Sequence, residues 1–337
     1  MKRLYIIVCL LALSLSMAAQ SWLCDTLGGD FRVRFFNQGH DYAGNVRSCV
    51  VRLLPVSPSD KAVLYVHGFN DYFFQKEMAC KFVDHDYGFY AVDLRRYGRS
   101  LLSGQKRCQV RNFNEYFADI DSALMAMRQD GFNDIILMGH STGGLVASYY
   151  MSRNPESSIK ALVLNSPFLD WNLGKMECFV GAISALGGIL PGIGVSPGGS
   201  TAYGESLHKN NHGEWEFNTE WKSIKSPKVD LGWVRAVNSA QRYLRKHKYS
   251  INIPILLMYS AKSVDLPNWT PEASTGDAVL DVADIRHYGL LLGHDVTTIK
   301  VEGGMHDLIL SPKDVREPLY TYIFQWLNRH LPAESSK

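Results

Sequence analysis

Residues 135–150 read IILMGHSTGGLVASYY. The apolar run 135–138 predicts a buried strand, and residues 145–150 predict the helix that follows it. Between them, Gly139-His140-Ser141-Thr142-Gly143 fits the pattern G-x-S-x-G, whose glycines allow the sharp turn that raises a serine hydroxyl above a sheet. A strand, this turn and a helix in that order predict a nucleophile elbow at Ser141.

Short apolar runs alternate with helical patterns on both sides of the elbow. Buried strands are expected at 63–66, 89–92, 135–138, 161–164, 255–259 and 298–301, after an antiparallel hairpin formed by 31–36 and 46–54. Apolar residues at helical spacing occupy 113–127, 142–153 and 320–327. Alternation of this length predicts an α/β fold with a mostly parallel, doubly wound sheet.

One segment interrupts this alternation. No buried strand is expected between residues 166 and 253, and residues 187–204 contain seven glycines and two prolines. A helix follows, with Trp233 and Leu244 on its apolar side. Insertions at the carboxyl ends of sheet strands lie where ligands bind. We therefore expect a helical lid over about residues 168–250 within one domain that spans 20–337; a purely structural insertion of helices is the alternative.

The charge balance and the N-terminus bear on partners and location. The chain has 35 Lys and Arg against 33 Asp and Glu. Lys2 and Arg3 precede the apolar run 4–15, and residues 16–20 are mostly small, which is typical of a cleavable export signal. The run is too short to span ~30 Å of hydrocarbon. We expect residues 1–19 to be a signal peptide and the protein to be exported, either periplasmic or secreted.

Removal of that segment would leave 33 basic and 33 acidic residues. Proteins that bind nucleic acid normally carry a basic excess, so no nucleic-acid partner is expected. Five cysteines would remain, and none of them forms a C-x-x-C pair of the kind that binds zinc. An exported chain could form one or two disulfides, with a pairing that spacing does not determine.

A serine hydroxyl needs a base, and in this kind of fold the partners follow in the order serine, acid, histidine. His306 lies in a glycine-rich turn directly after the last expected strand, so we expect it to be the base. Four other histidines fall in or beside helical patterns and are not expected to take part; they are His247, His287, His294 and His330.

The acid should follow the strand at 255–259. Asp265 is nearest in sequence, whereas Asp277 lies where the chain could return to the sheet edge and orient the imidazole. Asp281 and Asp284 are expected at a helix cap or on a solvated helix face. We favour Asp277 and keep Asp265 as the alternative.

An oxyanion hole needs two backbone N–H groups. Thr142 follows the nucleophile and supplies one of them. Phe69 follows the first buried strand in the turn His67-Gly68-Phe69 and is expected to supply the other. His67 and His140 are expected to be structural.

Together these segments resemble the α/β-hydrolase superfamily, and within it the monoacylglycerol lipase-like and lysophospholipase-like group, also known as serine aminopeptidase-like. The resemblance covers about residues 45–330 and rests on five matching segments: His67-Gly68, DLRRYGRS at 93–100 against the group's D-x-R-G-x-G-x-S, the elbow, 277–281 and 304–307. It implies a triad of Ser141, Asp277 and His306. Two features depart from the group: Arg96 replaces the usual glycine, and the loop 262–275 is longer.

These observations predict a serine hydrolase that cleaves carboxylic esters, of acyl or lipid type, through an acyl-enzyme. The expected substrate is a small-molecule acyl ester, no cofactor or metal is implied, and the apolar insertion is compatible with contact with a lipid or membrane surface. The oligomeric state is not determined.

Two other functions stay open at this point. An exopeptidase would need lid carboxylates to hold a substrate amine, and four are available: Glu205, Glu214, Glu216 and Glu220. A catalytically silent binding protein on the same scaffold is the third candidate, although such a site tends to lose a triad member.

Overall fold

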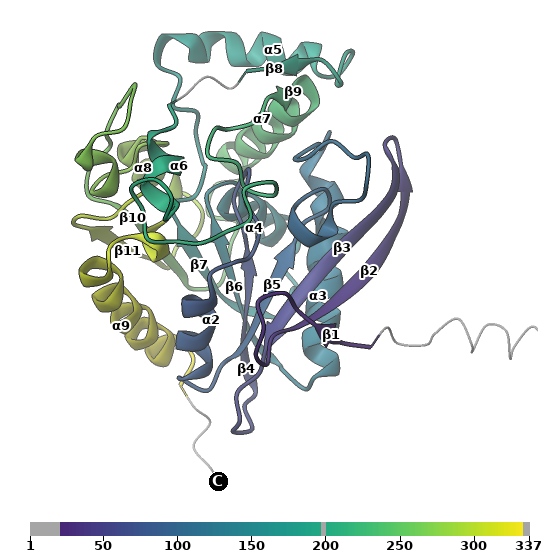
Figure 1. Cartoon of the computed structure of the whole chain (residues 1–337), viewed down its shortest axis with the longest axis vertical. Coiled ribbons are helices and arrows are strands. Elements are labelled where there is room, and N and C mark those ends of the chain that lie inside the picture. The colour runs from purple at the N-terminus through teal and green to yellow at the C-terminus, as the bar shows by residue number, and fades with distance from the viewer. Residues whose placement is uncertain (1–20, 197–199, 333–337) are drawn as a thin grey trace, which may run out of the picture.

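The computed structural model describes residues 21–196 and 200–332 of the chain (Figure 1). Its centre is a nine-stranded sheet with the order β1-β2-β3-β5-β4-β6-β7-β10-β11. The strands are β1 Leu23–Cys24, β2 Arg32–Asp41, β3 Gly44–Leu53, β4 Lys61–Val66, β5 Gly88–Asp93, β6 Asp134–His140, β7 Ile159–Asn165, β10 Ile255–Ser260 and β11 Val296–Val301.

Strand directions match the sequence-based prediction of a mostly parallel sheet. The hairpin β2–β3 joins β5 in antiparallel pairing, and β5, β4, β6, β7, β10 and β11 are mutually parallel. In the register, Val66 pairs with Gly139, and His140 pairs with Asn165. The carboxyl ends of β4, β6 and β7 therefore meet at one edge, where ligands bind in sheets of this kind.

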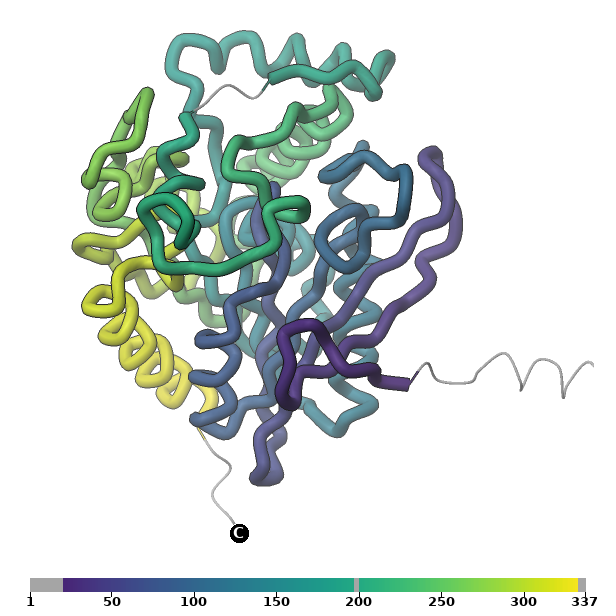
Figure 2. Tube along the Cα trace, viewed as in Figure 1, coloured from purple at the N-terminus to yellow at the C-terminus, as the bar shows by residue number. Residues whose placement is uncertain are grey.

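Helices cover both faces of this sheet. The helices are α2 Lys76–Val83, α3 Phe117–Gln129, α4 Thr142–Arg153, α8 Val282–Gly289 and α9 Lys313–His330, with short 3₁₀ turns η1 Gly98–Ser100, η2 Phe113–Tyr116 and η5 Leu308–Leu310. Apolar side chains of α3, α4 and α8 pack with Leu64 of β4 on one face, while those of α2 and α9 pack with Val63 on the other. Neighbouring residues of one strand thus serve two cores, which explains the continuous apolar runs. Figure 2 shows the hairpin and α9 on opposite sides of the molecule.

The insertion between β7 and β10 lies beyond the carboxyl edge of the sheet (Figure 1). It contains η3 Gly174–Phe179, α5 Val180–Leu186, β8 Gly194–Val195, α6 Ala202–Leu207, β9 Val229–Asp230 and α7 Leu231–Lys246. The strands β8 and β9 pair only with each other, so the described residues of this segment add no strand to the main sheet. A second irregular stretch follows β10 and contains η4 Pro271–Ser274.

The segment 93–100 forms a buried polar junction. Asp93 accepts hydrogen bonds from the N–H groups of Phe73 and Arg99, at 2.8 and 3.0 Å. The Arg99 guanidinium binds Asp93 at 2.9 Å and both carboxylate oxygens of Asp25, at 2.6 and 2.9 Å. This motif therefore ties the N-terminal segment to the end of β5 and does not contribute a side chain to the serine turn.

Two predictions concern the termini and the thiols. The expected signal peptide lies outside the described residues. Within them, no helix combines the length and the apolar content that crossing a membrane requires. The five cysteines of the described chain are free thiols: Cys49 and Cys108 are buried, and Cys24, Cys80 and Cys178 are exposed.

Candidate active site

Ser141 lies on a sharp turn between β6 and α4. Its backbone has φ 52° and ψ −118°, a conformation that L-residues rarely adopt and that marks a strained turn. A Cβ on Gly139 would lie 2.6 Å from the Gly143 oxygen, and one on Gly143 would lie 2.3 Å from the His67 oxygen. Glycine is therefore required at both positions, because only then can α4 start directly above the ends of β4 and β6.

A continuous hydrogen-bonded row joins Ser141, His306 and Asp277. His306 Nε2 lies 2.9 Å from Ser141 Oγ, and His306 Nδ1 lies 2.9 Å from Asp277 Oδ2. All three residues are buried, with 8% of Ser141 exposed and 2% or less of the other two. The serine, acid and histidine expected from the sequence therefore lie together at the carboxyl edge of the sheet.

Asp277 reaches this position because the chain after β10 leaves the sheet and returns. The Asp277 N–H donates to the Lys262 carbonyl, and its own carbonyl accepts from the Val264 N–H. Its Oδ1 accepts the N–H groups of Val279 and Leu280 at 2.9 and 2.8 Å, which leaves Oδ2 for the imidazole. The carboxylate is thus held by the backbone on one side and by His306 on the other.

The competing candidates lie elsewhere. Asp265 is on the outgoing limb of the same loop, is exposed, and makes no hydrogen bond with His306. Asp281 caps α8 by accepting the Ala283 N–H at 2.8 Å. The helix α8 begins at Val282, five residues after Asp277. His247, His287 and His294 are exposed, and His330 Nδ1 donates to the Trp326 carbonyl of α9 at 2.9 Å.

Two backbone N–H groups lie beside the serine turn without a protein acceptor. Among residues 21–196 and 200–332, neither Phe69 N–H nor Thr142 N–H has a hydrogen-bond acceptor. Gly68 packs against the elbow so closely that a Cβ there would lie 3.2 Å from Ser141 Cβ. The geometry therefore leaves two donors free next to Ser141, as an oxyanion hole requires.

A cavity of about 940 Å³ opens at Ser141. Ser141, Thr142, Phe69 and His306 line its floor, and the insertion forms most of its walls. Apolar side chains from the insertion that line it include Leu173, Val180, Ile183, Leu190, Trp233 and Val234. None of Glu205, Glu214, Glu216 and Glu220 lines it. Such a cavity suits an apolar ligand that is oriented by a few polar groups.

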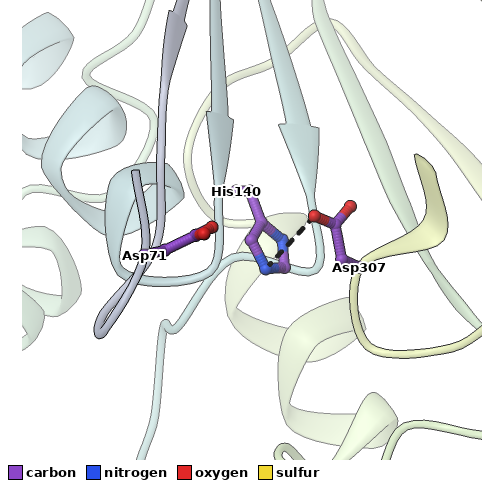
Figure 3. A group of neighbouring side chains, drawn as sticks. All are labelled: Asp71, His140 and Asp307. Carbon is purple, nitrogen blue, oxygen red and sulfur yellow. Dashed lines mark ion pairs between the residues drawn. The ribbon is translucent and has the colours of Figure 1, made fainter. Parts of the chain in front are cut away.

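Next to the triad, the structure brings together three polar side chains that sequence reasoning did not group. His140 lies between Asp71 and Asp307, and its Nε2 is 3.9 Å from Asp307 Oδ2 (Figure 3). His140 Nδ1 donates to the Asn165 carbonyl at 3.1 Å. In the neutral ring, Nδ1 therefore carries the hydrogen and Nε2 carries the lone pair. Burial lowers the pKa of His140, which favours the neutral form of the ring.

These three groups have the donor types of a metal site. Their ligand atoms lie within 4.8 Å of one another. The Lys222 ammonium, however, lies 2.9 Å from Asp71 Oδ1 and already neutralises one carboxylate. A second cation beside that ammonium would be repelled, so the donor set does not fit a metal ion well. Asp71 and Lys222 were missed because they are 151 residues apart in the sequence.

Comparisons with known proteins agree with this architecture. A family model described as serine aminopeptidase, S33, matches residues 57–265, which include Ser141 but neither Asp277 nor His306. The structure is similar to that of a monoacylglycerol lipase from Paleococcus ferrophilus, at TM-score 0.64 and 21% identity, over 83% of this chain and 99% of that one. It is similar to a soluble variant of the monoglyceride lipase from Saccharomyces cerevisiae, at TM-score 0.64 and 15% identity, over 88% and 96%.

One curated relative matches over a shorter stretch. The epoxide hydrolase 4 of Mus musculus is 28% identical over 105 residues, which is 31% of this chain and 28% of that protein's length. At these identities the solved structures show only that they share the fold of this chain. The family model shows which family the chain belongs to.

Proposed function

We propose, since the chain belongs to the serine aminopeptidase S33 family of α/β-hydrolases, that it is a serine hydrolase of carboxylic esters. The observation that carries this proposal is the hydrogen-bonded row Ser141–His306–Asp277 on a strained elbow beside two free N–H groups. A silent binding scaffold would not need this arrangement, because its parts serve the activation of a hydroxyl and the binding of an oxyanion.

In the proposed reaction Ser141 Oγ attacks the ester carbonyl carbon while His306 Nε2 takes the hydroxyl proton. Asp277 holds the ring so that Nδ1 carries its proton toward the carboxylate, and it stabilises the imidazolium that forms. The N–H groups of Phe69 and Thr142 bind the oxyanion. The C–O bond to the alcohol then breaks as His306 returns the proton to the leaving oxygen. Water, activated by the same histidine, hydrolyses the acyl-enzyme and restores the Ser141 hydroxyl.

The walls of the cavity favour an acyl group of lipid type. They are mostly apolar, and a cavity of about 940 Å³ has the volume to enclose a fatty-acyl or aromatic-acyl chain. The insertion supplies these walls, and we infer that it acts as a lid over the site. Its exposed apolar side chains, which include Met176, Phe179 and Ile189, would allow contact with a lipid surface.

An exopeptidase remains the second candidate and is less well supported. Glu214 pairs with Arg316 and Glu216 with Lys209, so both carboxylates already have cationic partners. Neither these nor Glu205 and Glu220 line the cavity. A substrate amine at the cavity would therefore meet no free glutamate of the insertion.

The decisive experiment is hydrolysis of p-nitrophenyl acetate, butyrate, octanoate and palmitate by the mature protein and by Ser141→Ala. We expect turnover by the wild type, with a preference for longer chains, and loss of at least about 10⁴-fold in Ser141→Ala. Absence of ester turnover, together with cleavage of aminoacyl anilides by the wild type, would replace this proposal with the exopeptidase. Equal turnover by the wild type and Ser141→Ala would contradict the nucleophile.

We also propose that the protein is exported and that residues 1–19 are removed. N-terminal sequencing of the mature protein from cells expressing the full chain should begin at Gln20. Recovery of an N-terminus at Met1 from the folded enzyme would contradict export through a cleaved signal.

A further inference from the structure

The loop that follows β4 carries Phe69, the expected oxyanion donor, and each of its next three residues bonds to the insertion. Phe69 itself packs on Trp233 of α7, with ring centroids 4.9 Å apart. Tyr72 OH accepts the Asn218 N–H at 2.8 Å, and its ring meets that of Trp221 at 5.1 Å. The loop 69–72 and the insertion segment 218–223 therefore form one packed unit beside the catalytic serine.

Asn70 shows how tightly this unit is joined. Its Nδ2 donates to the Ser223 carbonyl at 2.8 Å, and its Oδ1 accepts the Ser223 N–H at 3.2 Å and hydroxyl at 3.1 Å. The Asn70 backbone has φ 51°, which non-glycine residues adopt uncommonly. Three hydrogen bonds to one residue of the insertion hold this conformation directly after Phe69.

Asp71 and Lys222 form the second connection. Asp71 Oδ1 lies 2.9 Å from Lys222 Nζ, and the two side chains are only 2% and 8% exposed. Burial opposes ionisation of Asp71, but Lys222 outweighs it and holds the pKa of that carboxyl below its usual range. A buried ion pair is costly to break on one side, because the remaining charge is left without a partner. The Asp71–Lys222 pair therefore holds the insertion segment 218–223 firmly against the loop 69–72.

This connection bears on catalysis through geometry. The peptide N–H of Phe69 belongs to the same turn as Asn70, and the direction of this N–H depends on the backbone of the loop. Donors of an oxyanion hole act only when they meet the oxygen within hydrogen-bond distance, and a displacement of ~1 Å can cost ~10² in rate. We propose that Lys222 and Ser223 are positioning residues that hold the loop 69–72, and with it the Phe69 N–H, in the conformation that binds the oxyanion.

The inference deepens the proposed ester hydrolysis, on which it rests, and gives the insertion a role beyond access to the cavity. A wall that only contacts substrate would affect KM. A segment that aims an oxyanion donor affects kcat and the binding of tetrahedral oxyanion mimics, and it leaves the binding of products unchanged.

The test compares Lys222→Met with Lys209→Met. Both replace a lysine of the insertion that has an acidic partner. Lys209, however, pairs with Glu216 at the surface, where the Lys209 side chain is 47% exposed. With p-nitrophenyl acetate we expect Lys222→Met to lower kcat about 10- to 100-fold, with KM within about threefold. Its affinity for a trifluoromethyl ketone should fall by the same factor as kcat, while inhibition by the carboxylate product stays unchanged. Lys222→Arg should restore most of kcat, and Lys209→Met should match the wild type.

Two further variants keep the test decisive if Lys222→Met does not fold. Ser223→Ala removes the hydroxyl that lies 3.1 Å from Asn70 Oδ1 and 2.8 Å from the Lys225 carbonyl, and Asp71→Asn/Lys222→Met leaves no unpaired charge at this buried pair. Both should lower kcat and ketone affinity together while thermal unfolding stays cooperative. Unchanged kcat and ketone affinity in folded variants, or an equal loss in Lys209→Met, would overturn the inference.

The failure of this inference is distinguishable from failure of the proposed function. Labelling of Ser141 by a fluorophosphonate reports the reactivity of the serine without any ester turnover, because the hydroxyl oxygen displaces fluoride from phosphorus and His306 takes the proton. If the wild type is labelled but hydrolyses no ester, only the substrate assignment fails. Slower labelling in Lys222→Met than in Lys209→Met would then still support the positioning role, and equal rates would refute it.

Discussion

Both carboxylate oxygens of Asp277 accept hydrogen bonds, so a substitution at this position loses at least one of them. Oδ1 accepts two backbone N–H groups and Oδ2 accepts from His306. An asparagine would have to place its NH₂ against one of these donors. The imidazole would then lose its acceptor or adopt the other tautomer, with the proton on the nitrogen that must take the serine proton.

We therefore predict that Asp277→Asn lowers kcat by about 10³- to 10⁴-fold with little change in KM. The matched control is Asp265→Asn, which changes an exposed carboxylate of the same loop and should stay within about twofold of the wild type. Steady-state kinetics with p-nitrophenyl butyrate checks both. A large loss in Asp265→Asn and none in Asp277→Asn would assign the acid to the other limb of the loop.

Arg96 has a backbone conformation that favours glycine, and its own side-chain hydrogen bonds stabilise it. Its φ is 64°, in the region that favours glycine, and the resembling group usually has glycine there. Here the arginine is buried, donates to the Gln109 carbonyl at 3.2 Å, and binds both oxygens of Asp41 at 2.5 and 2.6 Å. These bonds offset the backbone cost, and they lower the pKa of Asp41 although burial opposes the shift. The departure from the group is thus a structural contact with the β2–β3 hairpin.

At the scale of elements, the segment around α5 separates the cavity from solvent. Ile183, in α5, lines the cavity, whereas Ile189, beyond its end, is 77% exposed and does not. If the cavity holds the acyl chain, a larger side chain at residue 183 will shorten the space that is available to it.

Ile183→Trp should accordingly reduce kcat/KM for p-nitrophenyl palmitate by about tenfold or more. It should leave kcat/KM for p-nitrophenyl acetate within about twofold of the wild type. The control Ile189→Trp adds the same volume outside the cavity and should leave the chain-length profile unchanged. The measurement is the ratio of kcat/KM for palmitate to that for acetate in the three proteins. An equal ratio in all three would place the acyl chain elsewhere in the cavity.

For the molecule as a whole, Arg99 connects segments that are far apart in the chain. Its guanidinium bonds to Asp25 in the N-terminal segment, to Asp93 at the end of β5, and to the carbonyl of Phe73. Burial alone would lower the pKa of Arg99, but the two carboxylates raise it above its ordinary value. Removal of the guanidinium would leave two buried carboxylates without their cation.

We predict that Arg99→Met lowers the free energy of unfolding by about 3–5 kcal/mol. Arg32→Met is the control, because the ion pair of Arg32 with Asp30, at 3.6 Å, is partly exposed. Loss of that pair should lower the free energy of unfolding by less than about 1 kcal/mol. Urea unfolding followed by circular dichroism measures both. A loss below about 1 kcal/mol in Arg99→Met would show that the junction contributes little to stability.

Much of the fold could be predicted because its signals are local. Five of the expected buried strands and α4 follow from runs of apolar residues that meet two cores. The strand expected at 298–301 forms as part of β11, but the prediction that it is buried was wrong, because β11 lies at the edge of the sheet and only Val301 is buried. The turn at Ser141 follows from glycines that clash with nothing only because they lack Cβ. The helix α2 was not predicted. It has eight residues, only three of them buried, and no side-chain cap, so it carries too little periodicity to recognise.

The sequence by itself determined the sheet, the elbow and the histidine turn, because each depends on backbone conformation and burial within a few neighbouring residues. It narrowed the acid to two candidates, and only the tertiary structure brought Asp277 to 2.9 Å from His306, because the path of a sixteen-residue loop depends on what it packs against. The contacts of Asn70 and Asp71 with the insertion, 153 and 151 residues away, were likewise decided only in the folded chain. Local patterns carry no record of such pairs, since their free energy arises from desolvation and charge pairing that exist only after the segments meet.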